Sequence, residues 1–272
     1  MLRDRKLLFV GGGNMAEALI QGLLDSKKML PSQVSFTEIK SERRQYIEQR
    51  FGISFFASNQ EAATSSDIIL FAVKPQSIEA VLADFKNVSL KGKFFISILA
   101  GTPIRKFENY FGEGTRVIRA MPNMASLIGR GIAGLSRGRF ASETDENIAA
   151  EIMSSTGDVV KVEENMLDAV TAVSGSGPAY FFYFIEALQQ AAVELGLPPE
   201  TASRLVLKTA LGAGHLAFES ADTPGVLRKK VTSPGGTTEA AVKVFDHAKV
   251  RDHIVEGVKA ACQRSKELSG EV

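Results

Sequence analysis

The first half of the chain alternates short apolar segments with segments of helical spacing, and this alternation constrains the fold more than any other feature. The apolar segments predict strands at 6–10, 33–39, 67–73, 93–99 and 115–121. The segments between them predict helices at 14–26, 41–51, 76–85 and 103–111. Two of the strands, 67–73 and 93–99, are apolar throughout, as strands buried on both faces are. The pattern therefore predicts a parallel sheet covered by helices on both faces, with right-handed crossovers.

The second half has a different pattern, because strand signals end near residue 165 and long helical periods replace them. These periods cover 165–195, 198–220 and 237–268, and they carry Ala and Leu on more than one face. Such helices form a tight bundle or present a surface that a second subunit buries. We expect an α/β protein, with a sheet domain at 1–164 followed by an all-helical domain at 165–272.

Composition excludes several classes of protein. The chain has 272 residues, a net charge of +1 and scattered Lys and Arg, which argues against a nucleic-acid-binding protein. A single cysteine, Cys262, excludes a disulfide framework, and His247 and His253 are too far apart in sequence to share a helix face, so no metal site is expected. The apolar stretch 179–197 contains two glutamates and two glutamines, so it predicts a core or interface helix rather than a membrane span. We expect a cytoplasmic protein.

A glycine-rich turn directly follows the first strand. Gly11, Gly13 and Ala16 form a G-x-G-x-x-A pattern that also opens a helix. In this context the first glycine allows a tight turn, the second lets a pyrophosphate approach the backbone, and the alanine lets helix and strand pack closely. The helix N-terminus adds free N–H groups and partial positive charge. The pattern predicts a dinucleotide-binding domain of the Rossmann type.

The end of the second strand leaves the choice of nucleotide open. Glu38 is an acidic residue suited to the 2′-hydroxyl of NAD. A set of polar and basic side chains able to hold a 2′-phosphate follows at once: Lys40, Ser41, Arg43 and Arg44. Further along, Pro75 stops the strand that ends in "FAVKPQ", so the backbone of residues 72–74 should face the ligand crevice. Residues 98–103 repeat this geometry after the next strand.

The segment "VTSPGGTTEA" at 231–240 predicts an anion-binding turn. Pro234, Gly235 and Gly236 lead into a helix that starts near Thr237, and successive N–H groups at such a start suit a small carboxylate. The alternative is an ordinary helix start that binds nothing.

Five segments together carry a resemblance to a known family. They are "GGGNMAEAL", "FAVKPQ", "VIRAMPNMAS", "DAVTAVSGSGPAYFF" and "VTSPGGTTEA", and their order and spacing resemble the pyrroline-5-carboxylate reductases over essentially the whole chain. The resemblance implies an NAD(P)-dependent oxidoreductase that reduces the C=N bond of 1-pyrroline-5-carboxylate to give L-proline, the last step of proline biosynthesis. NADP, as NADPH, is the expected cofactor, with NADH as the alternative.

The resemblance also implies roles for individual residues. Thr238 is the expected catalytic residue, with its hydroxyl near the ring nitrogen. The residues expected to bind substrate are Glu164, Ser233, Gly235, Gly236, Thr237 and Thr238. Those expected to bind the cofactor are Gly11, Gly12, Gly13, Asn14, Met15, Glu38, Asn59, Ala72, Val73, Lys74, Pro75, Ala100 and Gly101. For Glu164, a carboxylate placed near a helix start for stability is an equal alternative.

The chain departs from the family pattern at Lys229, Lys230, Ala221, Glu38 and Ile39. The last two put an NADP preference in doubt, and the first three affect a loop near the substrate. The family resemblance also implies a homodimer, interlaced through the helical domains and able to assemble into a pentamer of dimers.

Two other functions stay open on the residues alone. One is a short-hydroxyacid or ketopantoate-type reductase, which needs a proton donor on the helical domain; Lys208 is the candidate there. The other is a regulatory protein that binds NAD(P)H without turnover.

Overall fold

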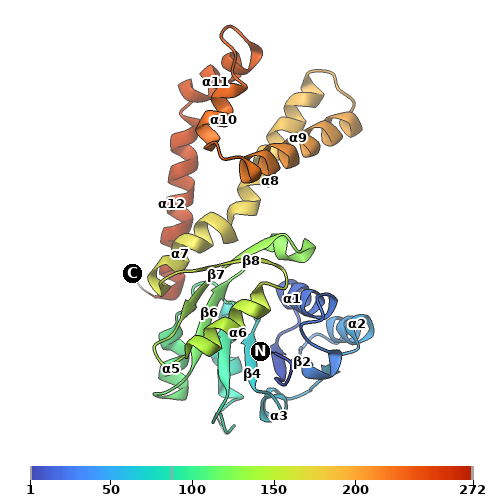
Figure 1. Ribbon diagram of the computed structural model, residues 1–272, viewed down its shortest axis with the longest axis vertical. Coiled ribbons are helices and arrows are strands. Elements are labelled where there is room, and N and C mark those ends of the chain that lie inside the picture. Colours follow the sequence, from blue (N-terminus) through green and yellow to red (C-terminus); the bar gives the residue numbers. More distant parts are fainter. Residues whose placement is uncertain (1, 87, 271–272) are drawn as a thin grey trace. The chain divides into compact units, whose positions relative to one another are not determined.

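The computed structural model describes residues 2–86 and 88–270, which fall into two compact units (Figure 1). One unit contains the chain up to Ser176 and again from Ala261 on, and the other contains Gly177–Ala260. The expected domain boundary at 164/165 therefore lies inside the first unit, and the end of the chain returns to that unit.

The first unit is built on one eight-stranded sheet. Its strands are β1 (Leu7–Val10), β2 (Val34–Thr37), β3 (Ser54–Phe55), β4 (Ile68–Phe71), β5 (Phe94–Ser97), β6 (Val117–Met121), β7 (Gly131–Arg137) and β8 (Gly157–Lys161). The strand order is β3-β2-β1-β4-β5-β6-β7-β8, and the first six strands are parallel, as the sequence predicts. β7 runs antiparallel to β6, because residues 122–130 between them are too few for a helical crossover.

Helices cover both faces of this sheet (Figure 1). They are α1 (Asn14–Asp25), α2 (Ser41–Phe51), α3 (Asn59–Thr64), α4 (Ile78–Ala83), α5 (Ile104–Phe111), α6 (Glu143–Met153) and α7 (Leu167–Val170). Successive residues of a strand point to opposite faces, so Leu7 and Phe9 join one core cluster while Leu8 and Val10 join the other. Phe71 anchors the second cluster through ring contacts with neighbouring phenylalanines. Burial on both faces is what makes β1 and β4 apolar throughout.

Unit 2 is all-helical. It contains α8 (Gly177–Glu194), α9 (Pro199–Glu219), α10 (Pro224–Lys230), α11 (Thr237–His247) and the start of α12 (Val250–Ser269). The helix expected over 237–268 is two helices, because Lys249 adopts a left-handed φ of 52° between them. The helix expected over 165–195 is also interrupted, by a π-helical turn at Thr171–Gly175. None of the described helices has the length and apolarity needed to span a membrane.

Candidate functional site

The turn after β1 has the geometry of a phosphate-binding loop. Gly11 has a φ of +100°, and a Cβ placed on it would lie 2.9 Å from the carbonyl oxygen of Ala72. Gly13 is the N-cap of α1 and is exposed; a Cβ there would meet only that same oxygen, at 3.9 Å. The first turn of α1 directs free N–H groups into this open space. The loop therefore fits the pyrophosphate of a dinucleotide.

The strand order places a second predicted segment beside this loop. β1 lies between β2 and β4, which is the point where the order reverses and where such sheets bind ligands. The Ala72 N–H donates to Val10 O at 2.9 Å, so residues 72–75 leave the sheet next to Gly11. The structure thus brings together two of the segments expected to bind the cofactor, 11–15 and 72–75.

The remaining cofactor candidates lie at the ends of neighbouring strands. Asn59 accepts a hydrogen bond from the Thr37 hydroxyl at 2.6 Å and donates to Asp84 at 2.8 Å, so it is held beside the end of β2. Ala100 is half-buried, whereas Gly101 is buried; a Cβ on Gly101 would lie 2.7 Å from Cβ of Leu268. Gly101 therefore packs against the end of α12, a contact that the sequence does not predict.

The side chains of Glu38 and Arg43, which carry opposite charges, both hydrogen-bond to the backbone of the phosphate-binding loop. The Gly12 N–H donates to Glu38 Oε2 at 3.0 Å, and the Arg43 Nε–H donates to the Gly12 carbonyl oxygen. The Arg43 guanidinium also pairs with Glu17 on α1, which accepts a further bond from the Tyr46 hydroxyl at 2.8 Å. Burial raises the pKa of Glu17, but the bonds from Arg43 and Tyr46 and the neighbouring positive charges outweigh burial, so its pKa lies below the ordinary value.

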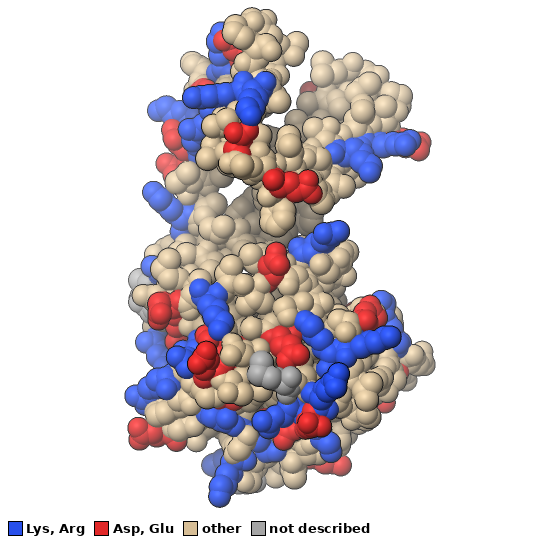
Figure 2. Space-filling model, viewed as in Figure 1, with Lys and Arg blue, Asp and Glu red and all other residues tan. Residues whose placement is uncertain are grey.

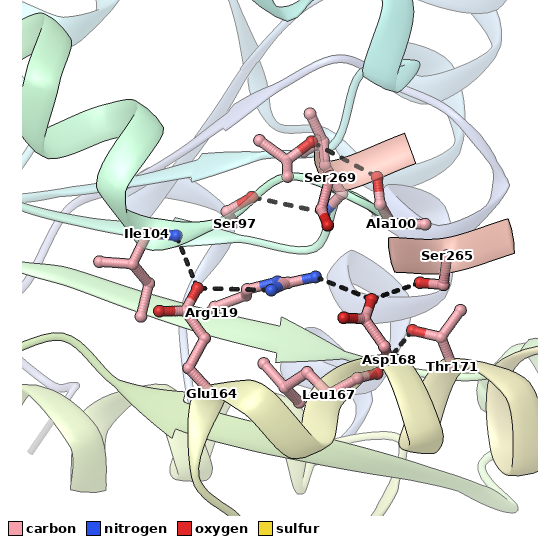
Figure 3. Close-up of polar contacts among 12 residues, drawn as sticks. Ser97, Ala100, Ile104, Arg119, Glu164, Leu167, Asp168, Thr171, Ser265 and Ser269 are labelled. Atoms are coloured by element: carbon pink, nitrogen blue, oxygen red, sulfur yellow. Dashed lines mark hydrogen bonds and ion pairs between the residues drawn. The ribbon is translucent and has the colours of Figure 1, made fainter. Parts of the chain in front are cut away.

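A buried ion cluster joins β6, α7, the start of α5 and the end of α12 (Figure 3). Arg119 lies 3.3 Å from Glu164 Oε1 and 3.9 Å from Asp168 Oδ1, and only 4% of its side chain is exposed. Asp168 accepts a bond from the Ser265 hydroxyl at 2.5 Å. The sequence signal for this cluster is a lone arginine in an otherwise apolar strand, since a buried guanidinium has to be paired.

Glu164, expected to bind substrate, takes part in this cluster. Its Oε1 accepts the Ile104 N–H at 2.7 Å, at the first residue of α5. The N-cap residue of that helix, Pro103, supplies no side-chain cap. Glu164 therefore caps α5 from a distant part of the chain, and its contact with substrate stays a prediction.

The loop expected to bind the substrate carboxylate opens α11 in unit 2. Gly235 has a φ of +72°, and its N–H donates to Glu239 Oε2 at 3.0 Å. The Gly236 N–H donates to the Ser233 carbonyl oxygen, which closes the turn. The first intrahelical bond runs from Ala240 N–H to Gly236 O, so the N–H groups before residue 240 start the helix without intrahelical acceptors. Among the residues expected to bind substrate, Thr237 and Thr238 therefore have N–H groups without intrahelical acceptors, and their binding of an anion stays a prediction.

Charge on the surface is mixed. Figure 2 shows Lys and Arg interspersed with Asp and Glu on the visible face, without a stripe of one sign. Among residues 2–86 and 88–270, no cluster of three or more His, Cys, Asp or Glu side chains is arranged to hold a metal ion.

Comparison with known proteins finds one family model in each half of the chain and relatives that match nearly all of it. The family model described as pyrroline-5-carboxylate reductase dimerisation matches residues 164–268. A model described as NADP oxidoreductase, coenzyme F420-dependent, matches residues 6–101. A pyrroline-5-carboxylate reductase of Methanosarcina acetivorans is 37% identical over 98% of this chain and 99% of its own length.

Two solved structures agree with this result. The pyrroline-5-carboxylate reductase of Coxiella burnetii superposes with a TM-score of 0.89 at 36% identity, covering 97% of this chain and 98% of its own. The Plasmodium falciparum enzyme, solved with NADP bound, also gives a TM-score of 0.89, at 30% identity, with 98% of each chain covered.

Proposed function

The chain belongs to the pyrroline-5-carboxylate reductase family, and on that premise we propose how its own residues carry out the reaction. The reaction is the reduction of the C=N bond of 1-pyrroline-5-carboxylate to L-proline, with NAD(P)H as the hydride donor. The ring nitrogen of the imine takes one proton from solvent, the imine carbon accepts the hydride, and the ring nitrogen ends as an amine while the nicotinamide is oxidised. Family membership favours this reaction over the two alternatives, a hydroxyacid reductase and a regulator that binds nucleotide without turnover.

The observation that carries our assignment of the substrate site is a carboxylate on the loop itself. Glu239 places its carboxylate on the Gly235 N–H, at the start of α11. A loop whose amide N–H groups donate to one carboxylate is suited to donate to another, and the N-terminus of α11 favours negative charge. The substrate carboxylate is bound by the Thr237 and Thr238 N–H groups, with Ser233, Gly235 and Gly236 shaping the turn.

The protein contributes orientation rather than strong acid–base chemistry. Thr238 places its hydroxyl at the ring nitrogen and holds the imine in position for reduction. Residues 11–15 hold the pyrophosphate, Glu38 and Asn59 lie at the adenosine end, and residues 72–75 with Ala100–Gly101 line the nicotinamide side. When bound, the reduced nicotinamide supplies the hydride.

In our proposal the helical unit, unit 2, is the domain through which two chains dimerise. A homodimer is then the smallest assembly. In α8 and α9 only Gly177, Ala202 and Val206 are buried, and no residue of α10 or α11 is. Large apolar side chains such as Phe181 and Phe218 are 74% and 82% exposed. A surface this apolar requires a second chain to cover it. A pentamer of such dimers and a cytoplasmic location are the finer expectations, and they stay predictions.

A steady-state assay tests the proposed function. Purified protein is mixed with NADH or NADPH and one of three substrates: pyrroline-5-carboxylate, ketopantoate or a β-keto acid. Loss of nicotinamide absorbance with pyrroline-5-carboxylate, and none above background with the other two, is the expected result. Turnover of ketopantoate alone would contradict the proposal, and so would nucleotide binding without turnover of any of the three.

A further inference from the structure

We propose that Glu38 makes this protein select NADH over NADPH, and that Glu17 reinforces the selection by holding Arg43 away from a 2′-phosphate. This proposal rests on the proposed function only in that the nucleotide binds at the phosphate-binding loop. It reverses the NADPH expected from the family resemblance.

The first step is the position of the Glu38 carboxylate. Its Oε2 accepts the Gly12 N–H at 3.0 Å and its Oε1 accepts the Lys40 N–H at 2.9 Å. Both oxygens are thereby fixed at the end of β2, next to the phosphate-binding loop. This is the place where a dinucleotide-binding sheet meets the adenosine ribose.

The second step is the chemistry of that position. Each carboxylate oxygen has lone pairs beyond the one used by a backbone N–H, so Glu38 is able to accept hydrogen bonds from both ribose hydroxyls of NADH. A 2′-phosphate replaces one of those donors by a group with close to two negative charges. Since the carboxylate is fixed by two N–H groups, it does not move aside without losing both bonds.

The third step concerns Arg43 and Arg44, two of the basic residues expected to hold a 2′-phosphate; the third, Lys40, is exposed. Arg43 donates its Nε–H to Gly12 O and pairs with Glu17, and 23% of its side chain is exposed. Arg44 lies over the Phe55 ring, 4.7 Å from its centre, and 3.9 Å from Glu48. Both guanidinium groups thus have partners within the protein.

The fourth step is that these contacts support one another. Glu38 holds the N–H of Gly12 and Arg43 holds its carbonyl oxygen, so the same residue of the loop is fixed on both sides. A Cβ on Gly12 would lie 2.6 Å from Ile47 Cδ1 and 3.3 Å from Glu38 Oε2, so a side chain at this position would crowd both Ile47 and the carboxylate. The arrangement is therefore a built site and not the chance position of an exposed side chain.

Calorimetric titration of the full-length protein with NADH and with NADPH, without substrate, tests the proposal. The wild type should bind NADH at least about tenfold more tightly, which corresponds to about 1.4 kcal/mol. Glu38→Gln removes the charge, so it should weaken NADH and strengthen NADPH until the preference is lost. Adding Glu17→Gln should release Arg43 and improve NADPH further. Glu42→Gln is the matched control: Glu42 is an exposed carboxylate near Glu38 in sequence, and its loss should keep the wild-type ratio.

The ratio of the wild-type dissociation constants for NADH and NADPH tests the proposal even if a variant does not fold. Equal or tighter binding of NADPH by the wild type would overturn the proposal, as would a Glu38→Gln protein that weakens both nucleotides alike. A change in ratio with Glu42→Gln as large as that with Glu38→Gln would overturn it too, because overall charge would then be the cause. Binding is measured without turnover, so a protein that prefers NADH but does not reduce pyrroline-5-carboxylate upholds this proposal while the proposed function fails.

Discussion

Replacing Glu164 by alanine should destabilise the cofactor-binding unit. The carboxylate accepts the Ile104 N–H at 2.7 Å, where α5 has no cap from its own N-cap residue. A hydrogen bond to a charged group contributes about 1.5–3 kcal/mol, and a negative charge at a helix start about 0.3–1 kcal/mol. The pair with Arg119 adds less, because a third of the Glu164 side chain is exposed. We expect a loss of about 2–3 kcal/mol in the free energy of unfolding.

Urea unfolding at one fixed protein concentration measures this loss, since the stability of an oligomer depends on concentration. Glu163→Ala is the control, because Glu163 is an exposed carboxylate next to Glu164 and makes no side-chain cap. If both variants unfold within about 0.5 kcal/mol of each other, the capping role is refuted. The KM for pyrroline-5-carboxylate, measured on the same folded protein, then tests the separate prediction that Glu164 contacts substrate.

Three further predictions concern Thr238 and Glu239 at the start of α11 and Glu17 on α1. Thr238→Ala should lower kcat/KM for pyrroline-5-carboxylate by about ten- to a hundredfold, with the nucleotide Kd nearly unchanged; equal loss in both would contradict a role at the ring nitrogen. Glu239→Gln should lower the KM for substrate, because it removes the charge of a carboxylate that competes with the substrate carboxylate for the same loop. The decrease should be larger at low salt than at high salt, and a raised KM would contradict this competition. Glu17 has a lowered pKa in the folded protein, so its carboxylate stabilises the fold above its ordinary pKa near 4.5 and this contribution is lost as the pH falls through the lowered value. The stability difference between wild type and Glu17→Gln should therefore shrink in acid, and a difference that grows there would reverse the sign we derive.

The sequence predicts most of the fold, because the signals involved are local. Helix α2 begins and ends at the predicted residues 41 and 51, where Gly52 in a left-handed conformation stops it. The five predicted strands are confirmed, because most of their side chains are apolar and buried. β8 is missed because it is mostly exposed and carries Asp158 and Lys161, so it lacks the pattern of a buried strand. β7 is missed for a related reason: its glycines and small residues give a weak strand signal.

In the candidate site, too, features set by local sequence are predictable and features set by long-range packing are not. Glycine positions at 11, 13 and 235 follow from local backbone requirements, so the two loops are predictable from the sequence. The partners of Arg119 lie 45 or more residues away, and a lone arginine in a strand indicates that it needs a carboxylate without saying which one. The use of Glu164 as a helix cap, the position of Gly101 under α12 and the pairing of Arg43 with Glu17 all depend on such long-range packing.

A crystal structure of the full chain with L-proline tests the central claim most directly. We expect the proline carboxylate within hydrogen-bond distance of the Thr237 and Thr238 N–H groups, with the ring nitrogen at the Thr238 hydroxyl and the Glu239 carboxylate displaced or turned aside. Proline bound elsewhere on the protein, with Glu239 still on the Gly235 N–H, would contradict the account.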